Sequence, residues 1–172
     1  MALYSTLEAG TTATWQASGG TYTLTLTSLA SAAARQGVKG DLADASGNLP
    51  EVLMFLLETK MGVAATNAAN KLSLFIGESN SGTAGTNNPA GLTGADASLG
   101  TPAEYTLQLA LAQSMNLSNN AGTGTQKQWL AYYPTQRYII PVIYNQTTQS
   151  LSGTAGDHIL TLVPYYRVQN SV

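Results

Sequence analysis

Apolar and polar residues alternate one by one in several short stretches of this chain. Threonines separate Tyr22, Leu24 and Leu26, and the same period of two runs through residues 71–78 and 105–117. Successive side chains of a β-strand point to opposite faces of a sheet, so this spacing is typical of strands with one buried face. The alternation therefore predicts a protein built from β-strands.

Residues 49–63 allow two interpretations. Pro50 and Glu51 follow Asn48 as they would at the start of a helix, and Lys60 with Gly62 would suit its end. The six consecutive apolar residues 52–57 equally suit a strand that is covered on both faces. Periodicity does not decide between the helix and the strand, and both remain open.

The last third of the chain contains three further strand candidates. Residues 126–133 and 137–144 are separated by Pro134, which presets the backbone for a turn, and they are therefore predicted to form a hairpin. A final strand is expected over residues 158–167. Because Pro141 lacks an N–H group, we expect its strand to lie at a sheet edge or to contain a bulge.

Together these stretches predict seven or eight short strands joined by loops rich in Gly, Ser, Thr and Asn. Such a layout is typical of an all-β fold, an antiparallel β-sandwich of the jelly-roll type. We expect one domain over residues 1–172, with an N-terminal arm over residues 1–20 and one long Gly/Asn-rich loop over residues 79–103. Since connections are usually about 4–6 residues long, we expect the long loop to contact a partner.

Charged residues make up only 9% of the chain, whereas about 25% is usual for a free globular domain. This composition indicates a surface that is partly covered by neighbouring proteins. The seven Lys and Arg residues are scattered and the net charge is -2, so no nucleic-acid partner is expected. The longest apolar run is far shorter than the ~20 residues that span a bilayer, so no membrane association is expected.

Residues that carry chemistry are few. His158 is the single candidate general base, and its neighbour Asp157 would point to the opposite face of a strand. One His and no Cys exclude the usual zinc ligand sets. The densest cluster of oxygen-bearing side chains comprises Asp41, Asp44, Ser46, Asn48 and Glu51. Its spacing departs from that of a calcium loop, and we expect no enzymatic activity, no metal and no cofactor.

Aromatic residues concentrate in the last third of the chain. They are Trp129, Tyr132, Tyr133, Tyr138, Tyr144, Tyr165 and Tyr166. Tyr and Trp are enriched at interfaces, but at strand spacing they also form cores and cross-strand pairs. We expect the two roles to divide this set about evenly.

Three segments, in order along the chain, carry structural motifs. A Thr-rich strand followed by a bend of small residues occupies residues 20–41, and the bend ends in Ala-Arg-Gln-Gly at 34–37. The long loop contributes residues 82–96, and Pro134 leads into the apolar stretch 138–143. In these segments the chain resembles small virion structural proteins of tailed bacteriophages.

The resemblance implies a jelly-roll protein of the virion, and we expect a cement or decoration protein on the outer surface of the capsid that binds the major capsid protein. A place in the neck, tail or fibre stays open. The N-terminal residues lack the basic and apolar regions of a secretory signal, so we expect synthesis in the cytoplasm of the host bacterium. We also expect a homo-oligomer, with a trimer as the first expectation.

Such a protein is expected to act through its arm, its long loop and the aromatic residues of its strand edges. The interface candidates are Trp15, Asn87, Asn88, Pro89, Trp129, Tyr165 and Tyr166. The alternative is a jelly-roll receptor- or carbohydrate-binding module of a phage tail, fibre or neck, in which Trp129 stacks on sugars. A jelly-roll hydrolase that uses His158 is a third interpretation, and the thin acid–base inventory argues against it.

Overall fold

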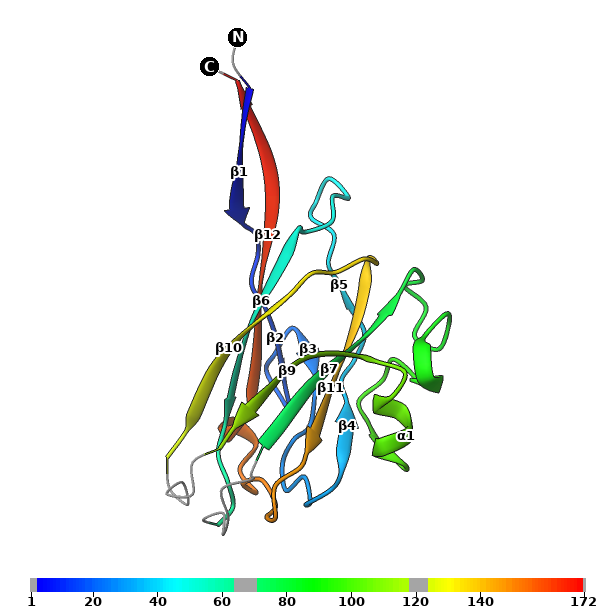
Figure 1. The fold of residues 1–172 in the computed structure, drawn as a ribbon, viewed down its shortest axis with the longest axis vertical. Coiled ribbons are helices and arrows are strands. Elements are labelled where there is room, and N and C mark those ends of the chain that lie inside the picture. The colour runs from blue at the N-terminus through cyan, green and yellow to red at the C-terminus, as the bar shows by residue number, and fades with distance from the viewer. Residues whose placement is uncertain (1–2, 64–70, 118–123, 172) are drawn as a thin grey trace.

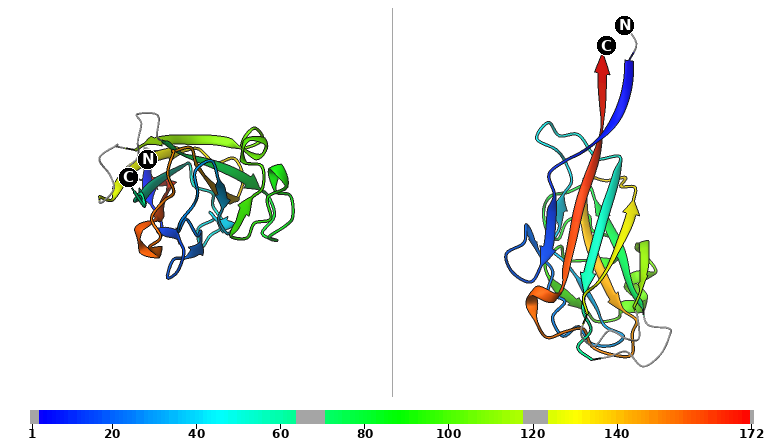
Figure 2. Two further views of the ribbon diagram at one scale, coloured as in Figure 1. Left: turned by 90° about the horizontal axis from the view of Figure 1, so that it is seen from below. Right: turned by 90° about the vertical axis from the view of Figure 1, so that its left-hand side faces the viewer.

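The computed structural model describes residues 3–63, 71–117 and 124–171. Strands account for 47% of the residues and helices for 7%, and the strands form two stacked sheets (Figure 1; Figure 2). The predicted all-β sandwich is therefore confirmed. None of the helices in these three segments is both long and apolar enough to cross a membrane.

Sheet A contains six strands. In spatial order, five of them are β10 (Gln126–Tyr132), β6 (Val52–Thr59), β12 (Ile159–Ser171), β2 (Ala13–Gln16) and β3 (Tyr22–Thr23). The sixth strand, β1 (Leu3–Ala9), pairs with the C-terminal half of β12. The strand pairs are antiparallel except that of β2 with β3, which is parallel.

Sheet B also contains six strands. Five of them, in spatial order, are β8 (Ala97–Leu99), β4 (Ala34–Gln36), β11 (Tyr138–Asn145), β7 (Lys71–Ser79) and β9 (Ala110–Asn116). The sixth, β5 (Gly40–Asp41), pairs with the start of β11. Short helices lie in the connections, namely η1 (Pro89–Gly91), α1 (Pro102–Thr106) and η2 (Ala155–Asp157).

The chain passes back and forth between the two sheets. Numbered from one to eight along the sequence, the main strands are β2, β4, β6, β7, β9, β10, β11 and β12. The spatial order is 1-8-3-6 in sheet A and 2-7-4-5 in sheet B. Among these eight strands, only the connection from β7 to β9 returns to the same sheet.

Alternate side chains of the strands meet between the sheets and form the core. Leu53 and Phe55 of β6 and Leu72 of β7 are each 0% exposed and belong to one apolar cluster. Full burial of such a side chain contributes about 1.5–3 kcal/mol. Residues 71–78 thus lie in the predicted strand, and residues 49–63 contain a strand instead of a helix.

The alternating stretch 21–27 is a strand only in small part. β3 pairs with β2, whereas Leu24 and Leu26 are buried outside any strand. The backbone N–H of Thr25 donates to Oδ1 of Asp96 in the long loop, at 3.0 Å. The prediction of a long strand here is wrong because a distant side chain accepts the hydrogen bond that a neighbouring strand would otherwise accept.

The strand predicted over residues 105–117 begins only at Ala110. The residues before it form the end of α1 and a turn, in which the N–H of Gln108 donates to the carbonyl of Tyr105 at 3.1 Å. Pro102 lies in the first turn of α1, where its fixed φ and missing N–H fit a helix. The first five residues of the predicted strand are therefore wrong.

β10 and β11 do not form the predicted hairpin. β10 pairs with β6 in sheet A, whereas β11 is central in sheet B, and residues 133–137 connect the two sheets. β11 suits this place because both of its faces are apolar, and Ile139 and Ile140 are each 0% exposed. Pro141 is tolerated because it lies opposite the break between β4 and β5, where the N–H of Gly37 donates to its carbonyl at 2.8 Å.

The N-terminal residues divide into two parts. β2 lies inside sheet A, whereas β1 leaves the sandwich and pairs with residues 165–171 of β12. This two-stranded segment, which we call the terminal ribbon, projects beyond both sheets (Figure 1). Of the arm predicted over residues 1–20, β1 projects from the body and β2 does not.

Candidate functional site

The side of sheet A that faces away from the core carries mostly apolar side chains. One cross-strand row contains Trp129, Leu56 and Thr161. The outer face of sheet A, as we define it, comprises Val52, Met54, Leu56, Trp129, Ala131, Ile159, Thr161, Val163 and Tyr165. A sheet with one solvated face normally carries polar residues there, so this face departs from the usual pattern.

The outer face of sheet A is open in the isolated chain. Trp129 is 53% exposed, while Met54 and Leu56 in the centre of the face are half-buried. In the right-hand view of Figure 2, β6, β10 and β12 face the viewer, and no other described strand or helix covers the middle of the three. The apolar side chains are therefore accessible to a partner.

Ion pairs border this face at both ends. Nζ of Lys127 contacts Oε1 of Glu58 at one end. At the other end, Nε of Arg167 donates to Oε2 of Glu51 at 2.9 Å, and this hydrogen bond holds the pKa of Glu51 below its ordinary value. The border charges are thus paired within the chain, and the face suits a neutral partner surface.

The corresponding face of sheet B is covered by the chain itself. Leu92 and Leu99 pack with Ile140 and Val142 of β11 in a second apolar cluster, and α1 lies on the same side (Figure 1). β6 and β11 are both apolar on their two faces, but within the described residues only β11 has its second face buried. The outer face of sheet A is thus the apolar sheet face that stays open.

A buried lysine holds the loop that covers sheet B. Lys39 is 8% exposed. Its Nζ donates to the carbonyls of Ser81, Thr83 and Thr86 at 2.8, 2.8 and 3.1 Å. Burial lowers the pKa of Lys39. The loop predicted to contact a partner is therefore packed against its own sheet.

Three predicted interface residues shape this loop. Nδ2 of Asn88 donates to the carbonyl of Leu92 at 2.7 Å, and Asn87 adopts a positive φ of 55°. Pro89 begins η1 and packs so closely over Gly77 that a Cβ there would lie 3.2 Å from its ring. These contacts explain the residues within the chain, and their role at an interface stays a prediction.

Trp15 is a core residue and not an interface anchor. It is 1% exposed, its Nε1 donates to the carbonyl of Val38 at 2.8 Å, and its ring stacks on that of Tyr22. Gly40 provides space for the indole, because a Cβ there would lie 2.5 Å from Cζ2 of the ring. The prediction is wrong because β2 joins sheet A and turns Trp15 inwards.

The fold brings two of the predicted residues, Trp129 and Tyr165, to the outer face of sheet A. They come from β10 and β12, on either side of β6. Tyr166 points to the opposite side of β12. The β6 side chains between them were not among the predicted interface residues, although the apolar run 52–57 was the signal that could have identified them.

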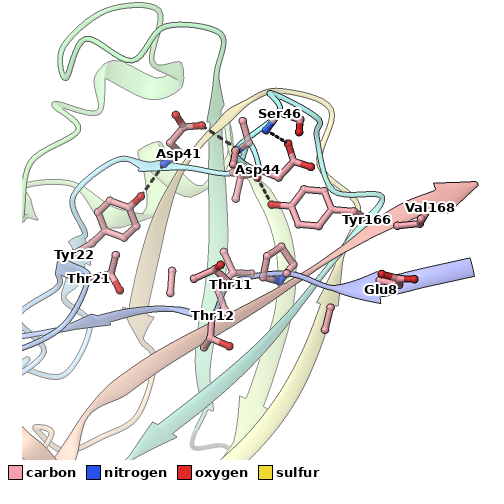
Figure 3. Close-up of a pocket in the computed structure, with 18 residues that line it drawn as sticks. Glu8, Thr11, Thr12, Thr21, Tyr22, Asp41, Asp44, Ser46, Tyr166 and Val168 are labelled. Atoms are coloured by element: carbon pink, nitrogen blue, oxygen red, sulfur yellow. Dashed lines mark hydrogen bonds between the residues drawn. The ribbon is translucent and has the colours of Figure 1, made fainter.

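Tyr166 lines a groove of about 520 Å³ between the β1–β2 connection, β12 and residues 41–46 (Figure 3). Its hydroxyl donates to the carbonyl of Leu42 at 2.6 Å, and burial raises the pKa of Tyr166. Thr12 and Thr21 are further lining residues with hydroxyl groups. The groove is therefore polar in part, with an aromatic ring at one side.

Two carboxylates of this groove, those of Asp41 and Asp44, are bound by neighbouring groups. Asp41 accepts hydrogen bonds from Nε and Nη2 of Arg137 at 2.9 and 2.8 Å. Oδ1 of Asp44 accepts the N–H groups of Ser46 and Asn48, both at 2.8 Å. The Arg137 contacts lower the pKa of Asp41, and the pKa of Asp44 is lowered mainly by the side-chain amide of Asn48, whose Nδ2 donates to Oδ2 at 2.9 Å, together with these backbone N–H groups. Within the described residues, no group of three or more His, Cys, Asp or Glu is placed to hold a metal ion.

Both ring nitrogens of His158 form hydrogen bonds within the chain. It is 1% exposed. Nε2–H donates to the carbonyl of Ser152 at 3.0 Å, so Nδ1 accepts the hydroxyl of Thr59 at 2.9 Å. Burial lowers the pKa of His158. The hydroxyl of Ser152 donates to Asp157 at 2.5 Å, and the arrangement is that of a structural histidine.

The side chains of the outer face of sheet A determine what it can do. Aromatic and aliphatic groups contribute to binding when they leave water, by about 25 cal/mol per Å² of buried apolar surface. Tryptophan is prominent among the residues that dominate interface energies. The face is therefore suited to adhesion.

Comparison of the chain with protein-family models, with curated proteins and with solved structures finds no match.

Proposed function

We propose that this chain is a non-enzymatic structural protein of a tailed-bacteriophage particle, a cement or decoration protein that binds the shell of the major capsid protein. The open, apolar outer face of sheet A carries the proposal, with Trp129 at 53% exposure. Contiguous exposed apolar surface marks sites of protein interaction. The three segments that resemble phage virion proteins support the choice of partner.

The strand order supports the jelly-roll form of the sandwich. A jelly roll places its eight strands as 1-8-3-6 and 2-7-4-5, and the eight main strands here have these orders. The resemblance to phage virion proteins implies the same form. Topology alone does not assign a function, however, because one fold serves many.

Attachment through this face would depend on apolar contact and shape. Association costs roughly 4–15 kcal/mol in lost freedom of motion, so the buried apolar area has to exceed that cost. The ion pairs of Glu58 and Glu51 already satisfy the border charges. We therefore expect attachment to depend only weakly on ionic strength.

The test is attachment to shells assembled from the major capsid protein of the same phage without this chain. Trp129→Ser and Met54→Ser each remove an apolar contact from the outer face, and we expect at least a tenfold loss of affinity, about 1.4 kcal/mol. Leu107→Ser is the matched control, because Leu107 is 86% exposed at the end of α1, which lies on the side of sheet B. If Trp129→Ser and Met54→Ser attach as strongly as Leu107→Ser, the proposal is contradicted. The absence of the protein from purified particles would contradict it as well.

The groove in Figure 3 favours a second candidate function, a carbohydrate-binding module of a tail, fibre or neck. Its volume of about 520 Å³ lies in the range of ligand sites, and its wall offers hydroxyls beside Tyr166. Binding on a glycan array that disappears in Thr12→Arg, which fills the groove, and persists in Trp129→Ser would favour this function over shell binding.

A further inference from the structure

We propose that the free edge of β1 pairs with β1 of a second copy of this chain, so that two terminal ribbons join into one four-stranded sheet. The two copies would be related by a two-fold axis, and the strands would run antiparallel. The pairing concerns the terminal ribbon and is separate from the outer face of sheet A.

The terminal ribbon buries little by itself. Residues 5–9 of β1 are all exposed, including Leu7 at 51%, and Arg167 and Gln169 opposite them are exposed as well. A two-stranded ribbon is marginally stable in water, and three or more strands or packing on another element are needed for independent stability. A further strand would provide what the ribbon lacks.

Backbone groups of β1 point towards this missing strand. The N–H of Gly10 donates to the carbonyl of Pro164, which fixes the phase of the antiparallel ladder between β1 and β12. Hydrogen-bonded pairs alternate along such a ladder. The N–H and carbonyl groups of Ser5, Leu7 and Ala9 are therefore directed away from β12, to the free side of β1.

The other sheet edges of the described chain carry features that discourage pairing. β3 and β8 are only two and three residues long, β9 has a register shift against β7, and β10 carries the exposed Lys127. The side of β12 that faces away from β1 is also unpaired beyond the end of β6, and this edge carries the exposed Arg167. Short strands, irregular pairing and lysines are the means by which natural edges avoid association. β1 is seven residues long, with neither proline nor lysine, and Glu8 is its one charged residue.

A second copy fits this edge better than an unrelated strand. When two β1 strands are centred on Thr6, the whole length of both is paired, and Ser5 lies opposite Leu7 of the second copy. The two Glu8 residues are then four positions apart along the strands, or about 13 Å, so their charges do not meet. About eight backbone hydrogen bonds would form. Because the ribbon projects beyond the sandwich, the two bodies stay apart (Figure 1).

This pairing has a consequence that rests on the proposed function. The two-fold axis of an edge-to-edge pair stands perpendicular to the sheet, so the outer faces of sheet A in both copies point to the same side. Two such faces can bind one shell together, and the second contact then benefits from a high effective concentration. Leu7 and Tyr165 would lie on the same side of the joined ribbon.

Sedimentation equilibrium of the full chain, at about 1–100 µM, tests the pairing without any shell. We expect a reversible monomer–dimer equilibrium in the wild type and at least a 30-fold weaker dimer in Leu7→Pro. That proline removes an outward N–H and leaves the hydrogen bonds between β1 and β12 in place. Leu7→Val is the matched control, because it keeps the N–H and an apolar side chain, and its dimer constant is expected within threefold of the wild type, as is that of Trp129→Ser.

Hydrogen exchange gives a second readout that does not depend on variants. The amides of Leu7 and Ala9 should become protected in step with the dimer fraction, while the amide of Glu8, which already donates towards β12 in the monomer, should gain less protection. A wild-type monomer throughout the range, a trimer, or an equally strong dimer in Leu7→Pro would overturn the pairing. Shell attachment of a monomeric wild type would still support the proposed function, so the two failures are distinguishable.

Discussion

Replacing Lys39 by methionine tests how the cover of sheet B is held in place. The ammonium group donates to three loop carbonyls and also lies 3.2 Å from Oγ of Ser79. It forms no ion pair with a carboxylate among the residues that the structure describes. Methionine keeps most of the side-chain volume and removes all of these donors. The substitution therefore isolates the hydrogen bonds from packing.

The expected loss of stability follows from the charge-assisted hydrogen bonds that the loop carbonyls lose. The hydroxyl of Ser79 lies 3.1 Å from the carbonyl of Thr86 and 3.3 Å from that of Ser81, and the N–H of Thr86 donates to the carbonyl of Thr83 at 3.1 Å. These acceptors therefore keep a neighbouring donor. A hydrogen bond to a charged group contributes about 1.5–3 kcal/mol, and the relief of desolvating the ammonium reduces the loss. We expect a net loss of about 1–3 kcal/mol.

Urea unfolding followed by circular dichroism measures this loss. With a slope of about 2 kcal/mol per M, the midpoint should fall by about 0.5–1.5 M. Lys71→Met is the matched control, because Lys71 is exposed, and its effect should stay within about 0.5 kcal/mol. A midpoint for Lys39→Met that coincides with that of Lys71→Met would refute the reasoning that Lys39 anchors the loop.

Two further predictions concern stability. Trp15→Phe should lower the free energy of unfolding by about 2–4 kcal/mol, because the smaller ring leaves a cavity and the carbonyl of Val38 loses its donor. Trp129→Phe should change it by less than about 0.5 kcal/mol. Equal shifts of the melting temperature in the two variants would contradict the burial of Trp15. Because burial holds the pKa of His158 below its ordinary 6.5, the unfolded chain binds the proton more tightly, so its contribution to stability is complete above pH 6.5 and decreases as the pH falls towards the folded-state pKa. Thermal melts between pH 8 and pH 5 should show this decrease in the wild type and a flatter profile in His158→Gln, and parallel profiles would argue against it.

Local alternation predicted those strands whose partners lie on regular neighbouring strands. Residues 71–78 and 158–167 lie mainly in β7 and β12, and β12 shows the expected alternation of burial over residues 159–165, whereas β7 is mostly buried on both faces. The same pattern over residues 21–27 produced only the two residues of β3, because its backbone binds Asp96 instead of a strand. A period of two reports which side chains are buried, and it does not report where the backbone hydrogen bonds go.

The candidate surface was predictable in one respect only. Trp129 is exposed on the same face of sheet A as Tyr165, with β6 between them, and their role at an interface stays a prediction, but Trp15 proved to be core. Both tryptophans lie in strands next to a glutamine, Gln16 for Trp15 and Gln128 for Trp129, so their neighbours did not identify which one is buried. The direction of each side chain depends on which sheet its strand joins.

The amino-acid sequence by itself determined the class of the protein, because alternation, loop composition and the scarcity of charge are local properties that require short strands and a sparsely charged surface. The sequence also shows that residues 52–57 and residues 139–143 are each apolar on both faces of a strand. Only the tertiary structure decided that the second is covered by the chain and the first is open. The physical reason is that covering a face depends on which distant segment packs on it, here the loop held by Lys39, and such non-local pairing leaves no mark on a strand's own residues.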